Sequence, residues 1–307
     1  MKSVKTISIL LVVLFGTFVF IALQSKPQAV QQNGARPTIA LSTFALFDVA
    51  KNIAGDSMDC FCILPNGVDV HSFEPTPKIM ARVHDAQLIV FNGAGLQPWT
   101  HVFEDQRNGL DMSRFIQLKE AVEDDDHHGD EGNNDPHYWL DTENMIIAAN
   151  VLKDQFTKIL PQNRDLYEQN AEEYIAKLKE IDRIYKAKLS TCKVDTIIVE
   201  HNAFSYLADK YGFNVESISG LSPDAQPSAQ IMADIINVVK EEKIGTIFFE
   251  SFASDKVAKA IATDAHVKTD TLQPIENITV DEAKKGVSYN SLMMDNLVKI
   301  AQARECR

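Results

Sequence analysis

The chain has 307 residues, which is enough for one large domain or for two lobes of ordinary size. Its composition, 45% hydrophobic and 24% charged, is that of an ordinary globular protein. The net charge of −13 at pH 7 argues against nucleic acid as a partner. An acidic surface is compatible with handling cations, but a solubilising role explains the charge better.

The N-terminus carries an export pattern. Lys2 and Lys5 precede an apolar run over residues 7–23, as in a signal sequence. This run of 17 residues is long for a signal core and close to the lower limit for a membrane span. No clear cleavage site and no lipid-accepting cysteine follow it, so residues 1–26 are either a signal peptide or an N-terminal anchor. Both alternatives place the rest of the chain in a periplasmic or other extracytoplasmic space, after a polar tether at residues 27–36.

Residues 37–162 alternate between strand and helix patterns. We predict four strands, at 37–42, 59–64, 87–91 and 114–118, with helices at 43–54 and 78–84. Further on, residues 142–160 have apolar side chains at helical spacing. Strands that alternate with helices in this way imply a mostly parallel sheet, so this stretch is predicted to be an N-terminal α/β lobe.

Residues 163–190 are predicted to form one long connecting helix. Apolar side chains recur at helical spacing through this stretch, which contains no Gly or Pro. A helix of this length would run about 40 Å, enough to span two lobes. A rigid connector is the preferred interpretation, and a core helix of one large domain is the alternative.

Residues 191–307 repeat the layout of the first lobe. Strands are predicted at 195–199, 214–218, 245–249 and 267–272, with helices at 203–211, 228–242, 254–264 and 289–303. The predicted fold class is therefore α/β, with two similar parallel-sheet lobes joined by a long rigid backbone helix. The similarity is one of layout only, because no repeated sequence is visible.

Three histidines lie at or near the carboxyl ends of predicted strands. His71 lies beyond the second strand, His137 follows the acidic loop after the fourth, and His201 comes two residues after the strand that ends at 199. Ligands bind at these ends in open α/β sheets, and neutral imidazole is a strong ligand for zinc and neighbouring metals. A single histidine at a strand end is more often structural. Three of them at matching positions in two lobes indicate a metal site in the interlobe cleft.

The acidic loop before His137 contains two further histidines, His127 and His128. The loop has no apolar anchor, so we do not expect high-affinity binding there. An accessory role as a weak metal-gathering loop and a plain solvated loop are the two alternatives.

Four cysteines follow the export pattern, and an oxidising compartment favours disulfides. Cys60 and Cys62 lie two apart in a strand-like run, on one face but too far apart to bridge easily. Cys192 and Cys306 are the better candidates for a disulfide, which would hold the C-terminal helix in place. The alternative is that all four are free, buried thiols.

Three motifs surround the three histidines. They are Pro65-Asn-Gly-Val-Asp-Val-His-Ser-Phe-Glu-Pro-Thr-Pro77, Asp135-Pro-His-Tyr-Trp-Leu-Asp141 and Glu200-His-Asn-Ala-Phe-Ser-Tyr206. They resemble the ligand motifs of the zinc- and manganese-binding receptors of ABC importers, and shorter matches occur at 222–228, 249–251 and 286–289. The resemblance covers about residues 37–306. It implies two lobes with a helical backbone and a metal bound by His71, His137 and His201.

The resemblance also bears on the choice of metal. In this family a histidine at the third ligand position, here His201, leans towards Zn2+ and a glutamate towards Mn2+, as expected from the softer nitrogen ligation that zinc favours. The fourth ligand departs from the family pattern, because Val70 and Val287 stand where members carry carboxylates. Water and Glu250 are the first candidates for the fourth ligand, ahead of Asp69 and a carboxylate of the acidic loop.

We therefore expect a monomeric, high-affinity receptor, and not an enzyme, that captures Zn2+, with Mn2+ less favoured, and delivers it to an ABC-type membrane permease. Two alternatives stay open. One is a zinc-dependent hydrolase that uses the three-histidine site with Glu250 or Glu200 as general base, although the chain has no His-Glu-x-x-His motif. The other is a surface adhesin of the same fold with a structural metal.

Overall fold

The computed structural model describes residues 34–121, 134–221, 227–251 and 255–307. The predicted signal peptide or anchor at 1–26, most of the tether at 27–36, and the loop with His127 and His128 lie outside these ranges. Within the described ranges, no helix has both the length and the apolar composition needed to cross a membrane.

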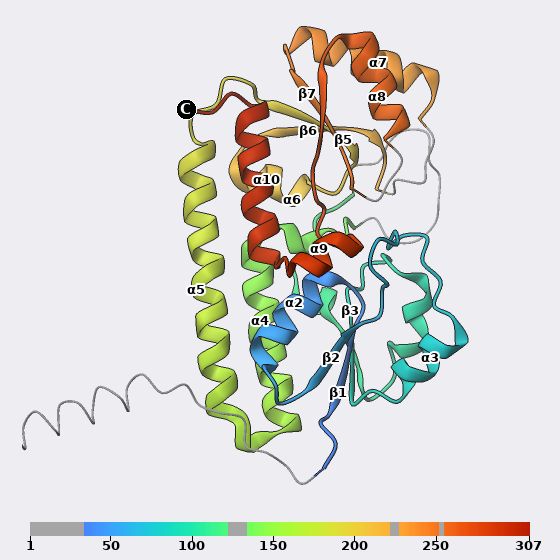
Figure 1. The fold of residues 1–307 in the computed structure, drawn as a ribbon, viewed down its shortest axis with the longest axis vertical. Coiled ribbons are helices and arrows are strands. Elements are labelled where there is room, and N and C mark those ends of the chain that lie inside the picture. Colours follow the sequence, from blue (N-terminus) through green and yellow to red (C-terminus); the bar gives the residue numbers. More distant parts are fainter. Residues whose placement is uncertain (1–33, 122–133, 222–226, 252–254) are drawn as a thin grey trace, which may run out of the picture.

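The first lobe contains a four-stranded parallel sheet in the order β2-β1-β3-β4. Its strands are β1 (Thr38–Leu41), β2 (Asp59–Cys62), β3 (Leu88–Phe91) and β4 (Gly109–Asp111). Helix α2 (Phe44–Ala54) connects β1 to β2, and α3 (Pro77–His84) lies between β2 and β3 (Figure 1). All four residues of β3 are apolar and buried, which is typical of a parallel strand that is covered on both faces.

The second lobe repeats this topology, with the strand order β6-β5-β7-β8. Its strands are β5 (Thr196–His201), β6 (Asn214–Ser219), β7 (Thr246–Phe249) and β8 (Lys268–Thr271). Its helices are α6 (Ser205–Tyr211), α7 (Ala229–Glu241), α8 (Lys256–Ala265), α9 (Val280–Lys285) and α10 (Tyr289–Ala303). Because strand order and direction match in the two sheets, the prediction of two similar parallel-sheet lobes is confirmed.

Two long helices form the backbone of the molecule. Helix α4 (Thr142–Ile159) is followed by a short 3-10 turn and then by α5 (Arg164–Leu189). With 26 residues, α5 is about 39 Å long. It runs alongside both lobes in Figure 1, against α4 in the lower half and α10 in the upper half. This is the long helix that the sequence predicts at 163–190.

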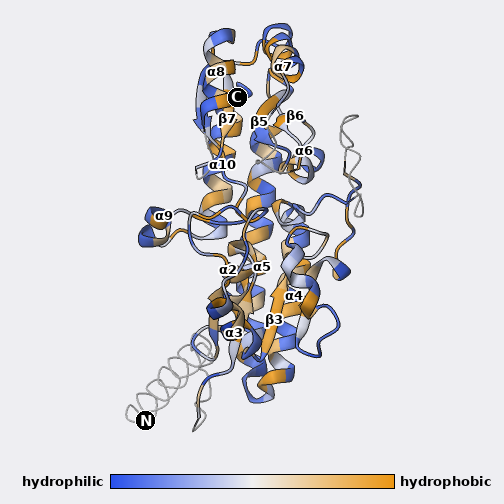
Figure 2. Ribbon diagram, turned by 90° about the vertical axis from the view of Figure 1, so that its right-hand side faces the viewer, coloured by the Kyte–Doolittle hydropathy of each residue, from blue (hydrophilic) through white to orange (hydrophobic). Residues whose placement is uncertain are grey.

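The buried face of α5 joins the lobes through one hydrophobic core. Its residues recur at helical spacing and are Leu166, Tyr167, Ala171, Tyr174, Leu178, Ile181, Tyr185 and Leu189. They belong to a single buried cluster that extends from β1 and β3 in the first lobe to β5 and α10 in the second. Figure 2 shows the hydrophobic colouring of β3 within this arrangement. The shared core fixes the relative position of the lobes by packing.

The fourth strand of the first sheet is not where the sequence pattern predicts it. The pattern predicts a strand at 114–118, whereas β4 is Gly109–Asp111 and pairs with β3. The Asp111 side chain accepts a hydrogen bond from the Ser113 amide (3.0 Å) and begins a 3-10 turn over Met112–Phe115. The turn takes the chain away from the sheet, so the prediction of a strand at 114–118 was wrong.

A disulfide joins Cys192, just after α5, to Cys306, just after α10. It is the pair that the sequence favours, and it closes a loop with a sequence separation of 114. Cys60 and Cys62 are free, and burial raises the pKa of both thiols to about 12. Such thiols are almost wholly protonated at neutral pH and are therefore poor nucleophiles and poor metal ligands.

Replacing both Cys192 and Cys306 by Ser is expected to lower the free energy of unfolding by about 2–5 kcal/mol, because the unfolded chain loses a cross-link. Chemical denaturation measures this loss, with Cys60→Ser as a control that removes a thiol but no disulfide. Wild-type protein that is denatured without reductant should expose only the thiols of Cys60 and Cys62. Four reactive thiols under these conditions would contradict the disulfide.

A buried carboxyl group lies where α2 packs against α5. Asp48 of α2 accepts a hydrogen bond from the Tyr174 hydroxyl of α5 (3.0 Å). Burial raises the pKa of Asp48 from 3.8 to about 6, although this hydrogen bond and one from the Tyr289 backbone oppose the shift. A carboxyl group with a raised folded-state pKa stabilises the fold most at low pH. That contribution is lost as the pH rises from about 4 to about 6.

Asp48→Asn removes this titration, and Asn can still accept the hydrogen bond from Tyr174. We expect the stability of the variant relative to wild type to rise by about 2–3 kcal/mol between pH 4 and pH 7. Urea denaturation across this pH range measures the difference, with Asp56→Asn, at an exposed position, as control. A difference that does not change with pH would show that Asp48 titrates with an ordinary pKa.

Candidate metal centre

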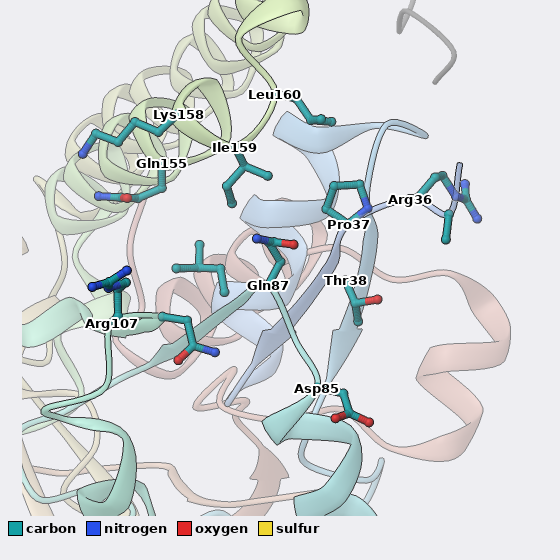
Figure 3. Close-up of a pocket in the computed structure, with 13 residues that line it drawn as sticks. Arg36, Pro37, Thr38, Asp85, Gln87, Arg107, Gln155, Lys158, Ile159 and Leu160 are labelled. Carbon is teal, nitrogen blue, oxygen red and sulfur yellow. The ribbon is translucent and has the colours of Figure 1, made fainter. Parts of the chain in front are cut away.

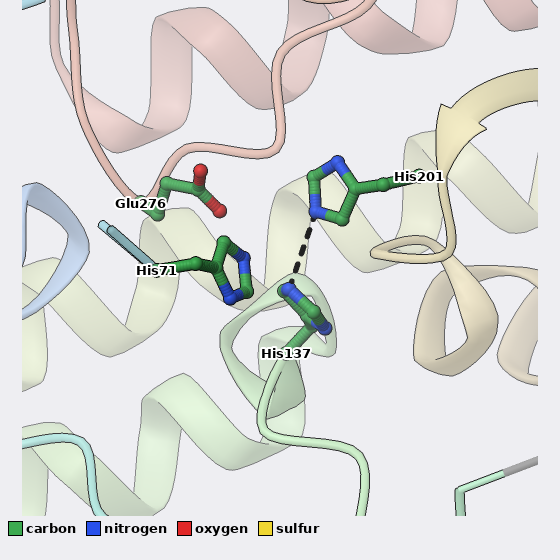
Figure 4. A group of neighbouring side chains, drawn as sticks. All are labelled: His71, His137, His201 and Glu276. Atoms are coloured by element: carbon green, nitrogen blue, oxygen red, sulfur yellow. Dashed lines mark hydrogen bonds between the residues drawn. The ribbon is translucent and has the colours of Figure 1, made fainter. Parts of the chain in front are cut away.

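Four side chains from separate segments point toward one another between the lobes (Figure 4). His71 lies in the loop after β2, and His137 directly precedes the 3-10 turn Tyr138–Leu140. His201 is the last residue of β5, and Glu276 lies in the irregular segment after β8. Because the strands of each sheet are parallel, the loops at their carboxyl ends meet in the space between the sheets.

The four side chains are close enough to share one ion. One donor atom from each residue lies within 4.8 Å of the donor atoms of the other three. The Nε2 atoms of His137 and His201 are 3.3 Å apart. Two nitrogens bound to one tetrahedral zinc ion would be separated by about 3.3 Å as well. The centroids of the three imidazole rings are 5.2–5.4 Å apart.

Several of these donor atoms are buried without a partner. His137, His201 and Glu276 are fully buried. The Nε2 atom of His71 and both carboxylate oxygens of Glu276 have no hydrogen-bond partner among the described residues. Burying a carboxylate is strongly unfavourable unless it is paired or binds a metal. These unpartnered atoms on facing side chains therefore indicate a cation site.

Carboxylates hold the far ring nitrogens of two of the histidines. His137 Nδ1 donates to Asp135 Oδ1 (2.8 Å), which also accepts from the His137 backbone amide (2.9 Å). His201 Nδ1 is hydrogen-bonded to Glu250 Oε1, and Ser205 Oγ donates to the second oxygen of Asp135. With Nδ1 engaged, both rings present Nε2 to the centre, which is how metal-binding histidines are oriented in proteins.

Burial and the neighbouring carboxylates together set the ionisation of the centre. Together with the neighbouring rings of His137 and His201, burial lowers the pKa of His71 well below its ordinary value. Burial also lowers the pKa of His137, although Asp135 opposes this shift. Both shifts favour neutral imidazole, the form that binds metal. Burial acts in the same direction on His201, but the Glu250 carboxylate outweighs it and raises the pKa of His201 to about 9, so this ring must lose a proton before it binds an ion. Burial raises the pKa of Glu276 well above its ordinary value despite the opposing effect of His201, so the carboxylate form needs a nearby cation.

The structure brings together the three histidines singled out in the sequence, but with a different fourth residue. Glu250 contacts the far nitrogen of His201 and is outside the four-residue group, which contains Glu276 instead. Asp69 orients the chain locally, because its Oδ1 accepts from the His71 amide (2.8 Å). Glu276 is therefore a further candidate for the fourth position, for which water, Glu250 and Asp69 were considered.

A positional signal for Glu276 is present in the sequence. The strand predicted at 267–272 ends four residues before Glu276, so the rule that selects His201 applies here as well. The comparison with family motifs drew attention to Val287 instead. Val287 follows α9 and packs against the main hydrophobic core.

The backbone next to Glu276 is strained. Ile275 has a φ of 63°, in the left-handed region where a β-branched residue is an outlier. This conformation costs about 1–3 kcal/mol and persists only where surrounding contacts impose it. Two such contacts are the hydrogen bonds from Trp139 Nε1 to the Pro274 carbonyl (2.7 Å) and from the Phe44 amide to the Glu276 carbonyl (2.8 Å).

A separate groove in the first lobe has a different chemical character. A groove of about 940 Å3 lies at the amino-terminal ends of β1 and β3, whereas the four facing side chains lie beyond carboxyl ends of strands (Figure 3). Its lining includes Arg36, Arg107 and Lys158. Asp85 is the one carboxylate among the lining residues, which include no histidine or cysteine. The groove therefore offers no set of metal ligands.

The two parallel-sheet lobes share a backbone helix and enclose buried imidazole and carboxyl groups. This architecture is that of a two-lobe solute-binding protein whose site consists of side chains that bind metal ions. Residues 39–303 match the ZnuA family, described as zinc-uptake complex component A periplasmic. The chain belongs to this family.

The relatives differ in the share of their own length that aligns with this chain. The zinc-binding lipoprotein AdcA of Streptococcus pneumoniae is 33% identical, over 98% of this chain and 61% of AdcA. The high-affinity zinc uptake system protein ZnuA of Bacillus subtilis is 32% identical, over 89% of each chain. The crystal structure of the Zn(II)-bound ZnuA-like domain of S. pneumoniae AdcA matches with a TM-score of 0.75 and 31% identity, over 88% of this chain and 100% of that chain. The chain thus spans about three fifths of the length of AdcA.

Glu276→Gln is expected to weaken Zn2+ binding more than Glu250→Gln, because the first change removes a charge that faces the centre and the second alters only a partner of His201. Loss of an outer partner typically costs about 10–100-fold in metal affinity, and we expect a larger loss for Glu276→Gln. Competition with a chromophoric zinc chelator measures both affinities, with the exposed Glu241→Gln as control. The opposite order of effects would make Glu250 the fourth ligand.

Proposed function

We propose that this protein is an extracytoplasmic receptor that captures Zn2+ between its two lobes and delivers it to an ABC-type membrane permease. The observation that carries the proposal is the buried group of His71, His137, His201 and Glu276, whose unpartnered carboxyl group needs a nearby cation in order to ionise. The names of the relatives AdcA and ZnuA, a zinc-binding lipoprotein and a zinc uptake protein, support the same cargo.

The donor set favours zinc over manganese. Three imidazole nitrogens and one carboxylate oxygen make a four-coordinate set of the kind that Zn2+ prefers. Mn2+ favours sites that are richer in oxygen. In this proposal His71, His137, His201 and Glu276 are the ligands, and Glu250 orients His201. Glu276 thus replaces Glu250 or water as the fourth ligand.

A filled coordination sphere favours a receptor over a zinc hydrolase. A catalytic zinc keeps one position open for water or substrate, whereas four side chains would close this one. The two glutamates considered as general bases are engaged elsewhere, Glu250 with His201 and Glu200 with the Glu250 amide (3.2 Å). We therefore propose no catalytic activity.

The setting of the receptor is inferred from the N-terminal pattern and the relatives. Basic residues before an apolar run predict export, and AdcA is named a lipoprotein. We propose that the protein acts as a monomer outside the cytoplasm, with residues 1–26 as signal peptide or anchor. Import further requires a permease, because a binding protein alone does not move an ion across a membrane.

Release to the permease requires a weaker site. The lobes share one hydrophobic core along α5, so a wide separation of the lobes would expose buried apolar surface to water. Displacement of the ligand-bearing loops breaks far fewer contacts. We therefore propose that loop movement, and not a large opening of the lobes, releases the ion.

Metal analysis of the purified protein is expected to give one Zn2+ per chain, and single changes of His71, His137 or His201 to Ala are each expected to weaken binding by more than about 100-fold. Isothermal titration with Zn2+ measures this, with the exposed His84→Ala as control. Stoichiometric, tightly bound zinc after any two of the three changes would exclude this site.

A deletion strain distinguishes a role in zinc import from a role in adhesion. An importer receptor predicts poor growth in zinc-depleted medium that is restored by added zinc or by the wild-type gene. The three His→Ala variants should fail to restore growth. Normal growth of the deletion strain under zinc depletion would favour an adhesin with a structural metal.

A further inference from the structure

The segment after β8 follows the second sheet in the chain but is attached to the first lobe. Five hydrogen bonds make the attachment. They are Trp139 Nε1 to Pro274 O (2.7 Å), Phe44 N to Glu276 O (2.8 Å), Asn277 Nδ2 to Pro65 O and to Val68 O (2.7 Å each), and Gly67 N to Ile278 O (2.8 Å). Glu276 is therefore held by the same lobe that carries His71 and His137.

Every polar atom of the Asn277 side chain, next to Glu276, is hydrogen-bonded. It is fully buried, and its Nδ2 donates to the carbonyls of Pro65 and Val68. Its Oδ1 accepts from the Ile278 amide (2.8 Å). Pro65 and Val68 belong to the loop that leads to His71. The Asn277 side chain thus connects the loop that leads to His71 with the residue next to Glu276.

The loop before His71 is shaped locally but attached through the segment at 277–278. Asp69 Oδ1 accepts from the amides of His71 (2.8 Å) and Ser72 (2.9 Å), which forms a turn within the loop. That turn orients residue 71 relative to its neighbours, while Val70 is buried in the main hydrophobic core and Val68 packs against it. The bonds from Asn277 and to the Ile278 carbonyl place the loop against the Glu276 segment.

We propose that Asn277 is a positioning residue that fixes the loop of His71 against Glu276, so that these two donors bind and release the metal as a pair. The inference rests on the proposed zinc site and adds to it a residue that offers no atom to the ion. Small displacements of donors weaken a metal site, so a residue that sets the distance between two donors controls affinity. His201, at the end of β5 in the other sheet, does not belong to this pair.

A double-mutant cycle with Zn2+ as the ligand tests the pairing. Asn277→Ala is expected to weaken Zn2+ binding by about 10–100-fold in the otherwise unchanged protein. With His71 already changed to Ala, the same substitution is expected to cost less than about threefold, because the donor that it aligns is gone. In the His201→Ala background it should keep its full effect. Asn108→Ala, which removes a bond to the Ala86 carbonyl (3.0 Å) beside the distant groove, is the control.

An equal cost of Asn277→Ala in all three backgrounds would overturn the positioning role, since a general loosening of the fold acts in each background alike. The absence of any cost in the unchanged protein would overturn it as well. Asn277→Ser keeps a neutral side chain with one hydroxyl donor, so it repeats the cycle if the alanine variant does not fold. Undiminished Zn2+ binding by both His71→Ala and His201→Ala would instead overturn the proposed zinc site, which makes the two failures distinguishable.

Discussion

The centre is organised around the carboxyl group of Glu276, which is fully buried between the two lobes and has no hydrogen-bond donor among the described residues. Glu276 has no partner for either oxygen among the described residues, and three imidazoles stand around it. In a medium of low polarity the ionised form of this group is favoured only beside a cation, and burial otherwise favours the neutral acid. Asp135 and Glu250 lie behind two of the rings and add negative charge as well as orientation. A divalent ion that binds here would therefore displace protons from the buried carboxyl group and from His201.

The scaffold makes this arrangement durable. One core runs along α5 through both lobes, and the disulfide ties the chain after α5 to the chain after α10. Polar contacts cross between the lobes next to the centre, as where the Tyr206 hydroxyl of α6 donates to the Asp135 carbonyl (2.9 Å). The sheets and helices act as a fixed frame, and adjustable geometry is confined to the loops at the strand ends.

Long-range regularity in the sequence predicted the frame and three of the four side chains in the buried group. An amphipathic stretch without Gly or Pro located α5 to within a residue or two, because a long helix leaves a repeated signal. The position of strand ends selected His71, His137 and His201, because parallel sheets gather ligands there. Glu276 also follows a predicted strand, but strand-end position alone does not distinguish a ligand from a surface carboxylate, and the hydrogen bonds from the other lobe that turn this segment toward the histidines are not encoded by a local pattern. The fourth strand was misplaced for a related reason, since one side-chain cap at Asp111 redirects the chain.

The left-handed backbone at Ile275 gives the centre a property that its donors alone do not reveal. If the segment relaxes when the ion leaves, the strain offsets about 1–3 kcal/mol of the binding free energy, or roughly 5–150-fold in affinity. Donor chemistry would then decide which ion is held, while backbone strain decides how firmly. Selectivity and retention would have separate structural origins, so one could change during evolution without the other.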